Sequence, residues 1–263
     1  MKERLDLLLV RRGLCPTRQR ARMDILEGHV FVDGRVERKP GRNCEETVQL
    51  ELVGESLRYV SRGGLKLEKA LRAFQTDPGG KVCLDCGAST GGFTDCLLQN
   101  GAARVYALDV GTGQLAPSLL GDPRVISMEN VNARALRPGD LPETPELAVI
   151  DVSFISLRLV VPAVRALLTD AGEIICLIKP QFEAGRRRLG KGGVVRDPET
   201  QLQVLEELLA FFPTLELYPA GLTYSPIRGD KGNTEYLCLL RRAPPVRIPE
   251  PRMVVEEARR ELK

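Results

Sequence analysis

The sequence predicts an α/β protein whose main body is a doubly wound, mostly parallel sheet, preceded by a small α+β domain. Two observations favour this fold. After about residue 60, short apolar segments with strand character alternate with longer segments of helical spacing. Before that point the elements are shorter and more basic, with eleven Lys and Arg against six Asp and Glu in residues 1–42, although the whole chain has a formal net charge of only +3. A basic front of this kind indicates a module that binds a polyanion.

The front domain, expected over residues 1–53, begins with two short helices. Residues 4–12 place leucines on one side of a helix, and residues 17–27 form a second helix whose first residue, a threonine, is a good N-cap. A hairpin follows over residues 30–36, because Asp-Gly between two apolar runs is typical of a tight turn. Alternation over residues 48–52 predicts a further strand.

These elements resemble the S4-like RNA-binding domain over about residues 3–52. The resemblance rests on Arg4-Leu5-Asp6, Gly13, Thr17-Arg18, Ala21, Gly28, Val30 and Val32-Asp33-Gly34. It implies that arginines contact RNA phosphates, which gives salt-dependent affinity with little sequence information. The candidate RNA-binding residues are Arg4, Arg11, Arg18, Arg22 and, in the main body, Arg62. A solvated arginine-rich surface without a ligand is the alternative.

The main body is expected over residues 61–242, after a linker at 54–60 and before a C-terminal tail at 243–263 to which we assign no function. Its strands are expected at residues 82–86, 104–109, 124–128, 147–151, 173–179, 211–217 and 235–240. Helices are expected at residues 63–75, 91–100, 156–169, from Pro198 onwards, and at 253–262 in the tail. In a doubly wound sheet, ligands bind beyond the carboxyl ends of the strands.

A glycine-rich stretch after the first strand of the body is the most informative motif. Residues 85–95 lead from a buried strand through a tight loop into a helix N-terminus, which presents backbone N–H groups to a ligand. Asp109 follows the next strand and is suited to bind ribose hydroxyls. The pattern Asp-x-Gly-x-x-x-Gly-Gly differs from GxGxxG and resembles the first motif of S-adenosylmethionine-dependent methyltransferases, which implies a Rossmann-like fold. The candidate residues for binding S-adenosyl-L-methionine are Asp85, Gly87, Ala88, Ser89, Thr90, Gly91, Gly92, Phe93, Thr94, Asp109 and, for the adenine, Asn132.

Charged residues also follow two other apolar strands. Asp151 and Lys179 are expected above the same edge of the sheet as the glycine loop. Lys66 lies on the helix before the first strand of the body, and Glu235 begins the last strand. A salt bridge or a snorkelling side chain explains any one of them alone. The four together, beside a cofactor loop, indicate a catalytic site.

Five segments resemble the TlyA family of rRNA 2′-O-methyltransferases, in which an S4-like domain precedes an FtsJ-like catalytic domain and which also carries an old haemolysin label. They are Ser61–Leu67, Asp85–Asp95, Val149–Leu157, Leu177–Gly185 and Gly232–Tyr236, in order within about residues 3–241. The FtsJ-like group uses a Lys-Asp-Lys-Glu tetrad, and this implies the catalytic residues Lys66, Asp151, Lys179 and Glu235. The resemblance also implies methylation of cytidine ribose, with ribosomal RNA or ribosomal subunits as partners.

The tetrad suits this reaction chemically. A ribose hydroxyl is a poor nucleophile towards a sulfonium methyl group until its proton is removed or shared. We expect Lys179 to be the base. Burial and the Lys66 cation favour its neutral form, while Asp151 and Glu235 oppose that effect and fix its orientation. The arginines at 186–188 could hold RNA phosphates or form a solvated charge run.

Histidine and cysteine usage excludes several kinds of chemistry. His29 is the only histidine, which rules out Ser-His-Asp and Cys-His catalysis. The seven cysteines are scattered, and Cys83 and Cys86 should point to opposite faces of a strand, so we expect buried thiols and no metal.

No apolar run approaches the roughly 18 residues of a membrane helix, and the first residues do not resemble a signal peptide, so we expect a cytoplasmic protein that does not enter a membrane. The oligomeric state stays open.

Three alternatives remain. A base methyltransferase is disfavoured, because residues 151–154 lack the Asn/Asp-Pro-Pro-aromatic motif of amino-directed enzymes and because Cys176 and Cys238 lie within strands. A non-catalytic RNA-binding ribosome assembly factor would have the cofactor pocket without essential chemistry. A haemolysin is less favoured, since the chain shows no signal peptide or membrane-spanning segment.

Overall fold

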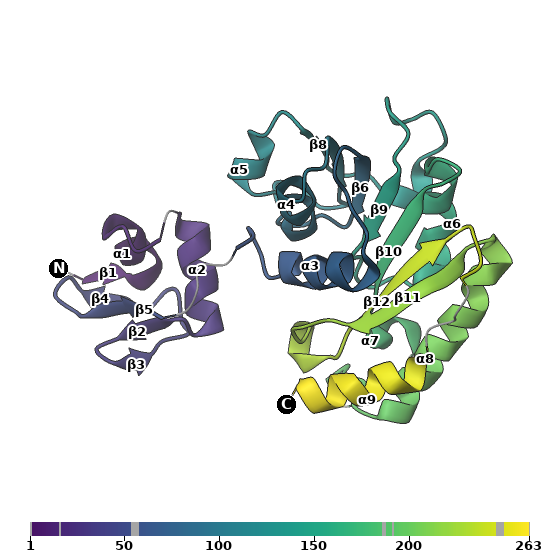
Figure 1. Cartoon of the computed structure of the whole chain (residues 1–263). Helices are drawn as coiled ribbons and strands as arrows, with labels where there is room; N and C mark the ends of the chain where they lie inside the picture. The colour runs from purple at the N-terminus through teal and green to yellow at the C-terminus, as the bar shows by residue number, and fades with distance from the viewer. Residues whose placement is uncertain are drawn as a thin grey trace. The chain divides into compact units, whose positions relative to one another are not determined.

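The computed structural model describes residues 2–15, 17–53, 58–185, 188–190, 192–245 and 250–262. The chain forms two compact units, residues 1–58 and residues 59–263, each with its own hydrophobic core (Figure 1). The arginines predicted at 186 and 187 lie outside the described residues.

Two helices and two small sheets make up the front unit. Its elements are β1 (Lys2–Arg4), α1 (Leu5–Arg11), α2 (Arg18–Glu27), β2 (Val30–Val32), β3 (Arg35–Val36), β4 (Asn43–Glu45) and β5 (Leu50–Leu52). β2 pairs antiparallel with β3 and β5, and β1 pairs antiparallel with β4. The Thr17 hydroxyl accepts a hydrogen bond from the Arg20 N–H, and Gly28 ends α2 with φ 82°, so the predicted cap and stop signals are both present.

The sequence pattern missed two strands of this unit. β1 and β4 contain three residues each and pair with one another, in the register Lys2 to Glu45. A strand this short shows too little alternation to be recognised. For the same reason the predicted helix at 4–12 is one residue too long at its start, where Arg4 belongs to β1.

A seven-stranded sheet forms the centre of the second unit. Its strands are β6 (Val82–Cys86), β7 (Arg104–Leu108), β8 (Val125–Met128), β9 (Leu147–Ile150), β10 (Glu173–Ile178), β11 (Tyr218–Tyr224) and β12 (Tyr236–Arg241). Their order is β11-β12-β10-β9-β6-β7-β8, and only β12 runs antiparallel to its neighbours. The strand order reverses at β6, which lies between β7 and β9. This is the switch point at which doubly wound sheets bind ligands.

Helices cover both faces of this sheet, as the sequence predicts. One core includes α3 (Gly63–Phe74), α4 (Gly92–Gln99) and the short α5 (Pro117–Leu120). The other includes α6 (Leu157–Leu167), α8 (Pro198–Phe211) and α9 (Pro251–Glu261), with α7 (Pro180–Glu183) directly after β10. Cys83 and Cys86 belong to different cores, and all seven cysteines are free and buried. Within the described residues, no helix is both long and apolar enough to cross a bilayer.

The strand predicted at residues 211–217 is wrong. α8 continues to Phe211, a 3₁₀ turn occupies Phe212–Leu215, and β11 begins only at Tyr218. Burial of apolar residues in this turn imitates a strand pattern, whereas Pro213 has a fixed φ that suits the start of a helical turn. The terminal helix predicted in the tail is present as α9.

Candidate active site

The glycine loop lies at the switch point of the sheet. Gly87 follows β6 with φ 89°, and a Cβ atom there would collide with the carbonyl group of Asp151, which follows β9. Ser89 has φ 48°, also in the left-handed region. The loop therefore folds back tightly between the ends of two neighbouring strands, and only glycine fits where the two backbones meet.

Asp109 organises the loop after β7. Its two carboxylate oxygens accept hydrogen bonds from the N–H groups of Ser89 and Gly111, at 2.8 and 2.7 Å. The carboxylate thus links the glycine loop to the neighbouring loop. Because each carboxylate oxygen has a second lone pair, Asp109 can still accept hydrogen bonds from a ribose diol.

Other residues of the predicted cofactor set support the loop from behind. Phe93 is buried in the core, and Asp85 is fully buried and accepts a 2.6 Å hydrogen bond from the Thr94 hydroxyl. Burial raises the pKa of Asp85 to about 7. Cβ atoms at Gly91 and Gly92 would collide with Leu119 and with Ser61, so these glycines serve close packing against neighbouring segments.

The remaining members of this set lie nearer the surface, with the exception of Ala88. Ser89 is exposed and Thr90 is half-buried, while Ala88 is buried. Asn132 is exposed and accepts a hydrogen bond from the Arg134 N–H at 3.0 Å, where it caps a 3₁₀ turn (Ala133–Ala135). The members of this set that a ligand can reach are therefore Gly87, Ser89, Thr90, Asp109 and Asn132.

Lys179 and Asp151 form an ion pair at the ends of β10 and β9. Lys179 Nζ lies 2.6 Å from Asp151 Oδ1 and donates a hydrogen bond of 2.9 Å to Ser153 Oγ. Only 10 % of the Lys179 side chain and 21 % of the Asp151 side chain are exposed. Because the two strands are parallel neighbours, their ends deliver both residues to the same edge of the sheet.

Lys66 and Glu235 form a second ion pair from segments 169 residues apart. Lys66 Nζ on α3 lies 2.6 Å from Glu235 Oε2, which precedes β12, and the side chains are 11 % and 3 % exposed. The Glu235 carboxylate packs against Gly229, where a Cβ atom would collide with it. This pair is almost completely withdrawn from solvent.

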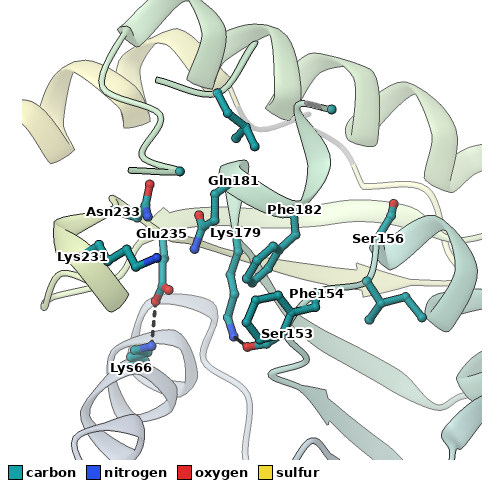
Figure 2. A pocket seen from close by; sticks show the side chains of 14 residues that line it. Lys66, Ser153, Phe154, Ser156, Lys179, Gln181, Phe182, Lys231, Asn233 and Glu235 are labelled. Carbon is teal, nitrogen blue, oxygen red and sulfur yellow. Dashed lines mark hydrogen bonds and ion pairs between the residues drawn. The ribbon is translucent and has the colours of Figure 1, made fainter. Parts of the chain in front are cut away.

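A cavity of about 720 Å³ brings the two pairs to one place. Lys66, Lys179 and Glu235 belong to its lining (Figure 2). Asp151 contributes through its ion pair with Lys179. Lys231 also lines the cavity. The two lysines and two acids predicted from the sequence are thus organised as two ion pairs, and three of the four side chains line one cavity.

An aromatic pair in the wall of this cavity is absent from the sequence-based site. Phe154 is 90 % exposed and has φ 64°, which is unusual for a bulky residue. Its ring lies 5.0 Å from that of Phe182, centroid to centroid, at an interplanar angle of 47°. The only available signal was an aromatic residue three positions after a strand-end aspartate. An exposed aromatic face in the wall of a cavity is suited to stacking on a planar ligand.

The predicted RNA-binding arginines have different surroundings. Arg4 and Arg18 each form a 3.0 Å ion pair with the buried Asp6, whose pKa is held below its ordinary value first by the hydrogen bond from Arg4. Arg11 pairs with Glu3 and Glu46. Arg22 is exposed, and no partner for it occurs in the described part of the chain. In the body, Arg62 is exposed at the start of α3, and Arg188 pairs with Glu207.

No cluster of three or more His, Cys, Asp or Glu side chains suited to a metal ion occurs among the described residues.

Fold and site together define a methyltransferase of the FtsJ-like class. The model of that class, the FtsJ-like methyltransferase, matches residues 59–242, and the S4 domain model matches residues 3–50. The 16S/23S rRNA (cytidine-2′-O)-methyltransferase TlyA of Mycobacterium tuberculosis is 45 % identical over 241 residues, covering 91 % of this chain and 90 % of that protein. Hemolysin A of Brachyspira hyodysenteriae is 42 % identical over 235 residues, covering 89 % and 98 %. A solved structure from Streptococcus thermophilus, described as a hemolysin, is 45 % identical with a TM-score of 0.80, covering 99 % and 96 %. The chain belongs to the TlyA family.

Proposed function

We propose that this protein transfers a methyl group from S-adenosylmethionine to the ribose 2′-hydroxyl of a cytidine in ribosomal RNA. The observation that carries the proposal is the convergence of Lys66, Lys179 and Glu235 on one cavity, with Asp151 joining Lys179 to the loop beside Gly87. Ribosomal RNA as the substrate and cytidine as the target nucleotide are inferred from the activity of the Mycobacterium tuberculosis relative.

The residues at the switch point fit the proposed cofactor. Gly87 leaves room beside the Asp151 carbonyl, and Ser89 is exposed on the same loop. Asp109 is placed to accept hydrogen bonds from a ribose diol, and Asn132 is the candidate for the adenine. When bound, S-adenosylmethionine would supply a methyl group on a positively charged sulfur, which becomes a neutral thioether after transfer.

Lys179 is the candidate general base. In its neutral form it accepts the proton of the 2′-hydroxyl as the 2′-oxygen forms its bond to the methyl carbon. Asp151 then compensates the positive charge that develops on Lys179, from 2.6 Å. The Lys66 and Glu235 pair lines the same cavity, so it can orient the ribose without itself accepting the proton.

The aromatic pair favours a nucleotide as the group that enters the cavity. A ribose in folded RNA is reached only if its nucleotide leaves the stack, and the exposed Phe154 face can replace the stacking that is lost. Arg22, which is exposed in the front unit, is a candidate contact to RNA phosphates. Action on RNA in the cytoplasm is part of the same proposal.

The decisive experiment is transfer of labelled methyl groups to purified 30S subunits, 50S subunits and naked rRNA, followed by nuclease digestion and mass spectrometry. A methyl group on a cytidine ribose is expected. A methyl group on a base would overturn the assignment, although Cys176 and Cys238 are fully buried and poorly placed for ring methylation. Complete lack of transfer would favour the assembly-factor alternative, and leakage of liposomes caused by the pure protein would favour the haemolysin alternative.

A further inference from the structure

Lys179 Nζ has two acceptors in this site, only one of which belongs to the proposed tetrad. Asp151 Oδ1 lies 2.6 Å away and Ser153 Oγ accepts a hydrogen bond of 2.9 Å. Ser153 and Lys179 both line the cavity (Figure 2). A neutral amine has two N–H groups and one lone pair. If both N–H groups are engaged by Asp151 and Ser153, the direction of the lone pair is fixed.

Several contacts hold the segment that carries Ser153 against the segment that carries Lys179. The Phe154 and Phe182 rings are in contact, although Phe154 must adopt a left-handed backbone to achieve this. The Glu183 carboxylate accepts hydrogen bonds from the Ser156 hydroxyl at 2.6 Å and from the Leu157 N–H at 2.8 Å. The position of Ser153 is therefore set by the contacts of the residues that follow it. Strain of this kind persists where the surroundings impose it, often at functional sites.

We propose that Ser153 is a positioning residue for methyl transfer, which holds Lys179 Nζ so that its lone pair faces the ribose hydroxyl. This inference rests on the proposed function. The proton still moves from the 2′-oxygen to Lys179 Nζ, and the 2′-oxygen forms the bond to the methyl carbon as the carbon–sulfur bond breaks. Ser153 gains or loses no proton in this step. Its contribution is to remove rotation about the Cε–Nζ bond of Lys179, and loss of alignment at a reacting atom can reduce the rate about 10²-fold.

Three variants test the inference. Ser153→Ala removes the acceptor, Ser153→Thr keeps it, and Ser118→Ala makes the same chemical change at an exposed position on α5. Single-turnover rates and the KM for the rRNA substrate should be measured together with S-adenosylmethionine affinity and the melting temperature. We expect Ser153→Ala to reduce the single-turnover rate by about 10- to 100-fold, with KM and cofactor affinity within about 3-fold of the parent. Ser153→Thr and Ser118→Ala should retain rates within about 3-fold of the parent.

Opposite outcomes would overturn the inference. A full rate for Ser153→Ala would show that Lys179 is aligned without it. A raised KM at an unchanged rate would make Ser153 a substrate contact, and an equal loss in Ser153→Thr would show that the hydroxyl is not what matters. If the parent protein transfers no methyl group to any rRNA, the proposed function itself fails. A Lys179→Ala variant that is inactive beside a fully active Ser153→Ala would leave the function standing and remove only this inference.

Discussion

The two halves of the site differ in which groups form them: one is formed by the backbone and the other by side chains. The cofactor half, around Gly87 and Asp109, depends on backbone N–H groups, left-handed turns and the absence of side chains. The proposed catalytic half depends on charged side chains, which arrive as two ion pairs from four separate segments. Substitutions in the first half should therefore act through steric fit, and substitutions in the second half should act through charge and proton transfer.

The catalytic half itself contains an open pair and a closed pair. Asp151 is 21 % exposed and its partner Lys179 also contacts Ser153, whereas Glu235 is 3 % exposed and is matched with Lys66. Removing one partner of a buried pair leaves an uncompensated charge, which costs more where water cannot reach it. The open pair should thus be the more important for the reaction and the closed pair the more important for stability.

The largest effect is expected from Lys179→Ala. General acid–base catalysis contributes about 10²- to 10⁴-fold in rate, so methyl transfer to rRNA should fall by that factor or more. Affinity for S-adenosylmethionine should remain near that of the parent, because the cofactor half does not use this side chain. Calorimetric titration of the cofactor with labelled methyl transfer measures both quantities. Near-normal turnover would remove Lys179 from the mechanism.

The closed pair is tested by Glu235→Leu, alone and with Lys66→Met. The single substitution leaves the Lys66 ammonium buried without its partner and should lower the free energy of unfolding by about 3–5 kcal/mol. The double substitution replaces both charges with apolar groups and should recover most of that loss, while methyl transfer stays impaired in both variants. Urea unfolding followed by circular dichroism measures the stability. If the single variant is as stable as the double one, the distinction between an open and a closed pair fails.

The cofactor half is tested by a matched pair of glycine substitutions. Gly87 and Gly139 have φ values of 89° and 93°, but a Cβ atom meets the Asp151 carbonyl only at Gly87 and meets nothing within 4 Å at Gly139. Both alanine variants carry the strain of a left-handed backbone, about 1–2 kcal/mol. Gly87→Ala should in addition weaken S-adenosylmethionine binding by about 10-fold or more, since the loop must move away from β9. Equal cofactor affinity in the two variants would show that the close approach is unimportant.

The sequence predicts the catalytic half better than the cofactor half, for a physical reason. Charged residues such as Asp151 and Lys179 after apolar strands are conspicuous, and parallel strands bring their carboxyl ends to one edge. In a glycine loop, by contrast, the sequence cannot show which side chains turn inward, and Asp85 and Phe93 prove to be internal. The exposed ring of Phe154 has no periodic signal at all.

How well each element of the fold is predicted also depends on whether its sequence shows a clear periodic pattern. The five strands that pair in parallel, β6 to β10, are found within one residue of their predicted positions, because they are short, largely apolar runs. The failures include β1 and β4, which are three residues long, and residues 211–217, where burial of a helix end imitates a strand and the true strand β11 begins only at Tyr218.

The smallest expected effect is on the pH dependence of stability. It comes from an internal acid of the cofactor half and not from the paired acids of the catalytic half. Burial raises the pKa of Asp85 to about 7, whereas an unfolded aspartate titrates near about 4. The folded state therefore binds a proton more tightly than the unfolded state, and the stability from this group is present below about pH 4 and is lost as the pH rises to about 7. The loss cannot exceed about 1.4 kcal/mol per pH unit.

Asp85→Asn cannot titrate, so urea unfolding at pH 5, 6, 7 and 8 should give a flatter profile than in the parent, with the difference between the two growing towards pH 5. Identical profiles would mean that Asp85 stays ionised at neutral pH and that its hydrogen bond from Thr94 outweighs the cost of burial.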